Sequence, residues 1–319
     1  MSQTTLLEKT LNDRDFAGVF TKVEHTGNLN LRNPNHVHIY HLNIENNSFI
    51  YEGLHRFLQN NVGRYVFSRA QLNQFHVDGD TESIGLRAIE LLRKSSKPTD
   101  TGAGGELGEM LLYAFLEQVL GAPKLLSKVE LKTSTNTYVY GSDGVHFLSS
   151  SDDKGLPIYQ LVLGESKIKG DLKAAVNDAF GSIRKIIANP VNEIRLVESN
   201  IFKEAYAPEQ AEYIKNIILP EKRGDTQYDK AFGVFLGYSL SIDATGLSNA
   251  QYRQCVKNKL VEDITTVITH IAKKINEKDG DGNDLTGYSF YFYTLPFNNT
   301  DNDRRSIIER LMGGGAADG

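Results

Sequence analysis

The chain has 319 residues, of which 40% are hydrophobic and 24% charged, a formal net charge of −5 and a single cysteine, Cys255. This composition is ordinary for a soluble globular protein, excludes an internal disulfide, and includes no apolar run near the roughly 20 residues of a membrane span. The first ten residues have no basic start followed by an apolar core, so we expect no secretory signal and a protein of the reducing cytoplasm.

The N-terminal third of the sequence predicts structure but no chemistry. The expected elements are a strand, two helices and a linker, over residues 36–42, 48–62, 82–93 and 94–105. His36 and His38 share one face of the predicted strand, which would suit a metal ion, but zinc sites normally need three or four ligands. We therefore favour a polar strand face at this position.

A largely apolar helix is predicted over residues 104–120, where Glu106 and Glu109 lie three residues apart and so on one face. Acidic residues in a first helical turn are stabilised by the helix dipole, which is the simpler explanation of both. The alternative is that one of them presents its carboxylate to a metal ion.

The rest of the chain alternates between strand and helix patterns. Strands are expected over residues 125–131, 136–148, 157–167, 231–240 and 288–296. Helices are expected over residues 171–188, within 191–230, over 249–277 and over 303–312, the last capped by Asn302 or Asp301.

The strand over residues 157–167 ends in a way that packing does not explain. Successive side chains of a strand point to opposite faces, so an apolar face of this strand ends in Glu165 and then Lys167. Burying unpaired charge is costly, which favours a metal site at the strand end. Asp143, from the preceding strand of a β-hairpin, would supply the second carboxylate.

Such a site suits the hydrolysis of phosphodiesters. Mg²⁺ takes only a few protein oxygens and keeps water in its other positions, and Asp143, Glu165 and the Ser166 carbonyl meet that need. Lys167 would orient the water and neutralise the phosphate. Taken singly, Asp143 could be an ordinary turn residue. Glu165 and Lys167 could likewise form a cross-strand surface pair. The order of the acidic helix, Asp, Glu-x-Lys and a second helix favours the metal site.

These residues resemble the active-site pattern of the PD-(D/E)xK nuclease superfamily, although Ser142 stands where that pattern has proline. More narrowly, Glu-Leu-Gly-Glu at 106–109, Gly-Ser-Asp-Gly-Val-His at 141–146 and Gly-Glu-Ser-Lys at 164–167 resemble the HamA-like nuclease subunit of the Hachiman anti-phage defence system. The resemblance implies an α/β fold, a restriction-endonuclease-like core with a central mixed sheet flanked by helices. It also implies catalysis by Lys167, Asp143 and Glu165, with Mg²⁺ as cofactor and Mn²⁺ able to substitute.

The same resemblance implies a defence effector that cleaves DNA and is controlled by a superfamily-2 helicase partner. The metal would be held by Asp143 and Glu165 together with Glu109 or Glu106, and we expect Glu109 to face it. A net charge of −5 gives no long-range attraction to DNA, so a helicase that grips the DNA fits the composition.

We therefore expect three regions along the chain. Residues 1–98 form an N-terminal α/β extension that docks the partner. Residues 99–312 form the nuclease core, and residues 313–319 form a flexible tail. Two alternatives stay open, a non-catalytic DNA- or protein-binding module of the same fold and a stand-alone restriction endonuclease with its own basic cleft. The residues do not distinguish DNA from RNA as the substrate.

Overall fold

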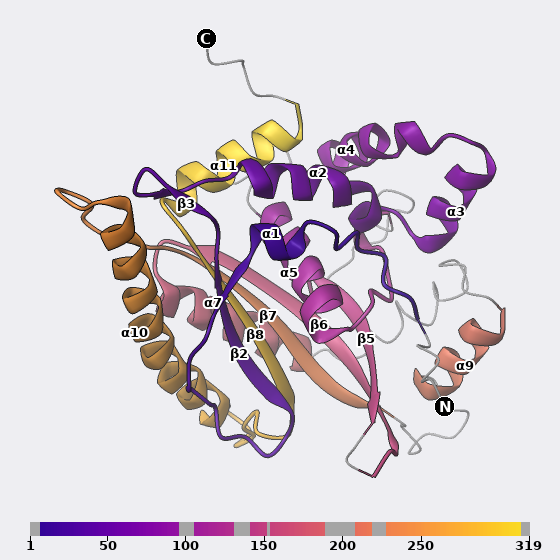
Figure 1. The fold of residues 1–319 in the computed structure, drawn as a ribbon. Coiled ribbons are helices and arrows are strands. Elements are labelled where there is room, and N and C mark those ends of the chain that lie inside the picture. Colours follow the sequence, from indigo (N-terminus) through magenta and orange to yellow (C-terminus); the bar gives the residue numbers. More distant parts are fainter. Residues whose placement is uncertain are drawn as a thin grey trace.

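The computed structural model describes residues 7–95, 105–130, 141–151, 154–188, 208–218 and 228–313. Within these residues a six-stranded mixed sheet forms the centre, in the order β1-β2-β8-β7-β6-β5 (Figure 1). Its strands are β1 (Thr21–Val23), β2 (Asn35–His41), β5 (Gly144–Ser151), β6 (Pro157–Lys169), β7 (Asp229–Ser239) and β8 (Ser289–Phe297). The mixed α/β architecture predicted from the sequence is confirmed.

The four inner strands run parallel and the two edge strands run antiparallel to their neighbours. β2, β8, β7 and β6 form the parallel set, with β1 added to β2 and β5 added to β6. Parallel strands covered on both faces are typically continuous apolar runs. β8 fits this pattern because it is buried at every position.

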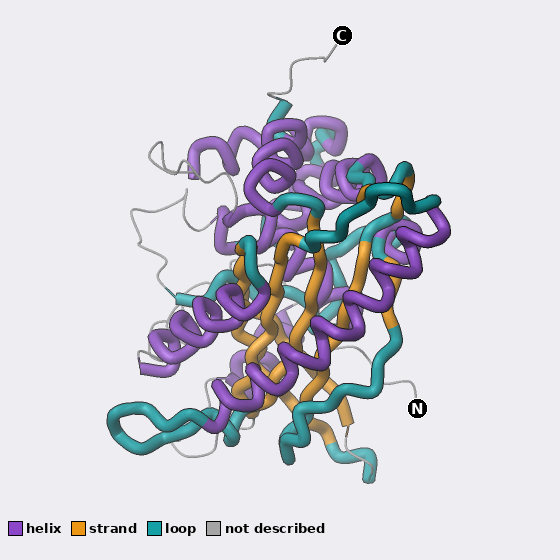
Figure 2. The backbone as a smooth tube through the Cα atoms, turned by 90° about the vertical axis from the view of Figure 1, so that its left-hand side faces the viewer, coloured by secondary structure: helices purple, strands orange, loops and turns teal. Residues whose placement is uncertain are grey.

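Two layers of helix cover the sheet (Figure 2). On one face lies α5 (Gly105–Phe115), which continues into a π-helical turn (Leu116–Leu120) and places the ring of Phe115 5.2 Å from that of Tyr293. On the other face lie α7 (Leu172–Ala188) and α10 (Asn249–Asn276). Phe180 of α7 packs there against Phe290 of β8, with ring centroids 5.9 Å apart.

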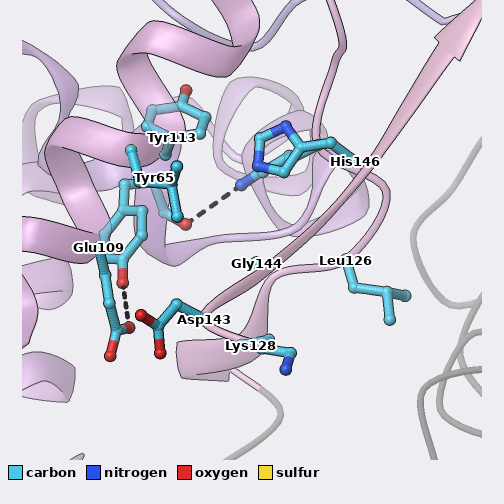
Figure 3. Close-up of a pocket in the computed structure, with 10 residues that line it drawn as sticks. Tyr65, Glu109, Tyr113, Leu126, Lys128, Asp143, Gly144 and His146 are labelled. Carbon is cyan, nitrogen blue, oxygen red and sulfur yellow. Dashed lines mark hydrogen bonds between the residues drawn. The ribbon is translucent and has the colours of Figure 1, made fainter. Parts of the chain in front are cut away.

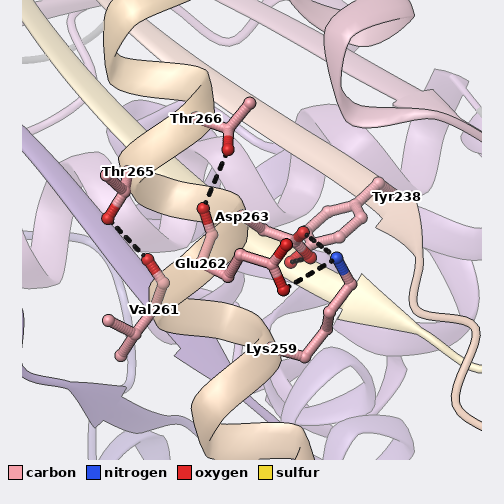
Figure 4. Close-up of polar contacts among 7 residues, drawn as sticks. All are labelled: Tyr238, Lys259, Val261, Glu262, Asp263, Thr265 and Thr266. Carbon is pink, nitrogen blue, oxygen red and sulfur yellow. Dashed lines mark hydrogen bonds and ion pairs between the residues drawn. The ribbon is translucent and has the colours of Figure 1, made fainter.

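Helix α10 is joined to the sheet by a polar contact as well as by its apolar face (Figure 4). The Tyr238 hydroxyl of β7 donates to Asp263 Oδ2 at 3.2 Å, and Lys259 Nζ lies 2.8 Å from Asp263 Oδ1. A capping box of Ser248 and Gln251 starts the helix by satisfying its first amide groups. These contacts fix the start of α10 and its position against β7.

Smaller elements close the end of the sheet near α2 (Glu52–Val66). They are α1 (Phe16–Val19), β3 (Ile44–Glu45), β4 (Ser48–Phe49), α3 (Arg69–Val77), a 3₁₀ turn (Thr81–Ser83), α4 (Ile84–Ser95) and α11 (Thr300–Leu311). Helix α9 (Pro208–Ile218) lies away from α2 (Figure 1). Residues 48–49, predicted to open a helix, instead pair with β3, so that α2 begins four residues later than expected.

Two predicted elements are wrong in part. Residues 125–127 are not in a strand and residues 128–130 are helical, while Lys124 makes only an isolated bridge to His146. Of the strand expected over residues 136–148, residues 136–140 lie outside the described part, residues 141–143 are not in a strand, and β5 begins at Gly144. The cap of α11 is Asn299, whose side chain accepts from the Asn302 amide at 3.0 Å, and not Asn302 or Asp301.

The predicted boundary near residue 98 falls within residues 96–104, outside the described part, as does most of the span 191–230 and the tail from 314. Strands β1 and β2 of the N-terminal region nevertheless complete the same sheet as β5 to β8. None of the helices that the structure describes is long and apolar enough to cross a membrane.

Candidate functional site

The hairpin of β5 and β6 places Asp143 beside Glu165. Its antiparallel register pairs Gly144 with Gly164, so Asp143, one residue before β5, comes next to Glu165 at the end of the ladder. The Asp143 amide still donates to the Gly164 carbonyl at 2.7 Å. The backbone therefore holds Asp143 at the point where β5 begins.

The carboxylate of Asp143 lies at the open edge of β6. Its Oδ2 accepts from the backbone N–H of Ser166 at 2.7 Å and from the Ser166 hydroxyl at 2.8 Å. Within the described part of the chain, all hydrogen bonds to this carboxylate go to that one oxygen. Because a buried amide needs an acceptor, Asp143 takes over the role that a carbonyl of β5 would otherwise have.

Glu165 and Lys167 form an ion pair on one face of β6, and the Glu165 side chain is only 3% exposed. Burial, followed by the negative charge of Asp143, raises the pKa of Glu165 to about 7. The Lys167 ammonium and the Ser182 hydroxyl act in the opposite direction. Burial alone would lower the pKa of Lys167, but the charge of Glu165 and its hydrogen bond raise it. The two adjacent carboxylates thus favour a nearby positive charge.

A second acidic contact involves helix α5. The Tyr65 hydroxyl, at the end of α2, donates to Glu109 Oε2 at 2.8 Å. Figure 3 shows this hydroxyl and the carboxylates of Glu109 and Asp143 turned toward one another. They line a cavity of about 20 Å³, enough for one water molecule. Glu106 is not among the residues lining it, although its charge contributes, after burial and the charges of Glu109 and Asp143, to raising the pKa of Tyr65.

The two glutamates reach Asp143 from opposite faces of the sheet. Ser166 faces α5, because a Cβ built on Gly108 would lie only 3.0 Å from its hydroxyl oxygen. Glu165 is the next residue along the strand, so it faces the side of α7. Among the described residues, no group of three or more His, Cys, Asp or Glu side chains is placed to hold one metal ion. The Asp143 carboxylate therefore lies with Ser166 and Glu109 on the α5 side, while Glu165 is its neighbour in the β5–β6 register and feels its charge.

Sequence reasoning did not find Tyr65 or the two lysines around it. Tyr65 and Glu109 are 44 residues apart, and nothing in the local pattern of α2 indicates the contact. Lys128 donates to the Ser142 carbonyl, next to Asp143 in the chain, and Lys124 donates to carbonyls at the end of α2, the helix that carries Tyr65. Residues 125–130, part of the segment predicted as a strand, lie between and beside these two lysines and are not in a strand.

The histidine pair of β2 lies apart from these carboxylates. The rings of His36 and His38 stack in parallel, 4.0 Å between centroids. Burial is the main cause that lowers the pKa of His36 to about 3 and of His38 to about 4, so both rings are neutral at neutral pH.

Comparison with known proteins gives one family. A family model described as HamA matches residues 18–311, well over half of the chain. No curated protein matches it.

Proposed function

The chain belongs to the HamA family of Hachiman anti-phage defence proteins, as its three motifs predicted, and from this premise we propose that it is a metal-dependent DNA nuclease. The observation that carries the proposal is the end of β6. There the buried carboxylate of Glu165 lies beside Asp143 and is paired with one ammonium, that of Lys167. Structural ion pairs also occur in proteins, but a buried glutamate whose pKa is raised by burial and by a neighbouring carboxylate is typical of a site that binds a cation.

The residues fit Mg²⁺. Mg²⁺ needs only one or two protein carboxylates and completes its octahedron with water and substrate phosphate. Asp143 and Glu165 would hold it, with the Ser166 carbonyl as a further oxygen. Glu109, on the other side of Asp143, would bind through water or act on the same carboxylate. When bound, the ion would supply Lewis acidity and a water of lowered pKa.

The chain's own groups have separate tasks in this proposal. Ser166 fixes the Asp143 carboxylate through two hydrogen bonds, so that the other oxygen keeps its direction. Lys167, 25% exposed, can reach a phosphate in solvent while its stem stays packed. Its charge stabilises the negative charge that develops on the phosphate during hydrolysis.

Metal binding tests the proposal directly. We expect the purified protein to bind Mn²⁺ in a calorimetric titration and to nick plasmid DNA with Mg²⁺ but not with EDTA, alone or with its partner. Asp143→Asn should weaken Mn²⁺ binding by at least about 10-fold, because it removes a charged ligand. The control is Glu24→Gln, which neutralises a carboxylate whose side chain is 83% exposed. Wild-type protein that binds Mn²⁺ but nicks no DNA would instead favour a non-catalytic binding module.

We further propose that a superfamily-2 helicase of the same defence system is the partner and that it docks on the N-terminal helices. The motif resemblance implies the helicase, and a net charge of −5 leaves DNA binding to another subunit. Val77 of α3 and Leu86 of α4, 72% and 70% exposed, are the most exposed large apolar side chains among the described residues. Large apolar side chains this exposed on two successive helices support an interface there.

Co-expression of both subunits tests this docking surface. Val77→Asp combined with Leu86→Asp should release the helicase from the tagged protein, since each places an unpaired charge in the contact. Val261→Asp, on the exposed side of α10, is the matched control and should co-purify as wild type does. Equal recovery of the helicase with all three proteins would place the interface elsewhere.

A further inference from the structure

A tyrosine from the N-terminal region contributes to the acidic site. Tyr65 lies in the last turn of α2, a helix that carries no other proposed site residue, and its hydroxyl donates to Glu109 at 2.8 Å. The same hydroxyl faces the Asp143 carboxylate across the small cavity (Figure 3). The neutral hydroxyl of Tyr65 thus holds the Glu109 carboxylate on the side that faces Asp143.

The end of α2 is fixed by a buried lysine. Lys124, 3% exposed, directs its ammonium to the carbonyls of Arg64 at 2.5 Å, Tyr65 at 3.3 Å and Phe67 at 2.6 Å. Carbonyls at the end of a helix have no partner within the helix, and a lysine that accepts this role ties the last turn down. The backbone of Tyr65 therefore has little freedom to move.

Lys124 is in turn fixed to the continuation of α5. Its backbone N–H donates to Glu117 Oε1 at 2.8 Å, and Glu117 belongs to the π-helical turn that follows α5. Helices α2 and α5 are therefore connected twice, once through Lys124 and Glu117 and once through Tyr65 and Glu109. The first connection is structural, and the second ends on a carboxylate of the acidic site.

We propose that Tyr65 is a positioning residue that holds the Glu109 carboxylate beside Asp143, a role that rests on the proposed function of the site. Two carboxylates that face each other repel, and a glutamate side chain has several rotamers that would take it away. A hydrogen bond from a buried hydroxyl to the ionised carboxylate selects one of them. Tyr65 thereby keeps Glu109 within reach of an ion bound to Asp143.

Replacing Tyr65 by phenylalanine removes the hydroxyl and keeps the ring. Losing a residue that orients a metal ligand typically costs 10- to 100-fold in metal affinity, so Tyr65→Phe should weaken Mn²⁺ binding by about that factor. The Mg²⁺ concentration for half-maximal nicking should rise, while the nicking rate at saturating Mg²⁺ stays near that of wild type. Both effects should be measured, the first by calorimetry without DNA.

Tyr113→Phe is the matched control. Its ring lies 5.7 Å from that of Tyr65 and lines the same cavity, but its hydroxyl hydrogen-bonds with Thr10 and not with a proposed ligand. We expect wild-type Mn²⁺ affinity for Tyr113→Phe. A double-mutant cycle adds a second measurement, because the Tyr65 effect should vanish when Glu109 is already glutamine.

Distinct results would overturn the inference. Wild-type Mn²⁺ affinity for Tyr65→Phe, or equal losses in Tyr65→Phe and Tyr113→Phe, would remove the positioning role, as would a full Tyr65 effect in the Glu109→Gln background. Wild-type protein that binds Mn²⁺ but nicks no DNA would overturn the nuclease function alone, since the affinity comparison still holds. Wild-type protein that binds no Mn²⁺ would overturn both.

Discussion

Lys167→Met is expected to lower DNA nicking by about 10²–10³-fold while Mn²⁺ binding is kept, which is the cost of losing one preorganised electrostatic group. An ammonium does not ligate a cation, and Lys167 forms an ion pair with Glu165, one of the proposed ligands. Its removal therefore leaves the carboxylates in place and takes away a competing positive charge. Methionine preserves the packing of the stem, so the loss falls on the charge alone.

A nicking time course beside a calorimetric Mn²⁺ titration measures both parts. Lys169→Met is the control, because Lys169 is the next lysine on the same face of β6 and pairs with Asp178 of α7 at 2.7 Å. It should nick DNA at nearly the wild-type rate. Full nicking by Lys167→Met would exclude this residue from the mechanism, and lost Mn²⁺ binding would show that it maintains the site and does not act in turnover.

Glu117→Ala is expected to destabilise the protein by about 3–5 kcal/mol, the largest effect on stability that we predict. Glu117 is fully buried, and its carboxylate accepts from the amides of Thr10, Leu11 and Lys124 and from the Thr10 hydroxyl. Alanine leaves three buried amides without an acceptor. Each then costs free energy, because water does not reach it to replace the lost hydrogen bond. It also releases residues 10–11 from the π-helical turn that follows α5.

Urea unfolding measures the change in free energy of unfolding. Glu117→Gln is the matched variant, because its amide oxygen keeps one acceptor at nearly the same volume, and it should lose clearly less stability than Glu117→Ala. Equal loss in the two variants would mean that the charge, and not the number of acceptors, stabilises this region. A change below about 1 kcal/mol for Glu117→Ala would contradict the prediction, since that is the size of an ordinary surface effect.

The elements that the sequence predicted well have strong internal patterns. β7 and β8 are continuous apolar runs, and α7 and α10 repeat their buried residues at helical spacing. The failure at residues 125–130 has a physical cause. Its apolar residues resemble a strand, but the backbone there follows Glu117 and the inward contacts of Lys124 and Lys128. The groups that these side chains contact either lie far away in the sequence or belong to no periodic hydrophobic pattern, so the sequence does not reveal them.

In the candidate site, too, the features set by a local sequence pattern were predicted and those set by tertiary packing were not. Alternation along β6 was enough to predict that Glu165 and Lys167 share a face, and the hairpin was enough to predict Asp143 beside them. That Asp143 accepts from Ser166 depends on β5 starting one residue later, a detail below what a pattern specifies. The approach of Glu109 and Glu165 from opposite faces depends on how α5 packs at Gly108, which only the assembled sheet determines.

The position of β2 in the sheet has a consequence for synthesis of the chain. β2 lies between β1 and β8, and His38 and Thr294, which meet across that parallel pair, are 256 residues apart in the sequence. At roughly 5–20 residues per second, a ribosome needs about 13–50 s to make the partner strand. During that time β2 presents an unpaired edge, the kind of surface on which nascent chains pair wrongly. The sheet therefore closes only after β8 has been made, and truncation before residue 289 would leave its centre open.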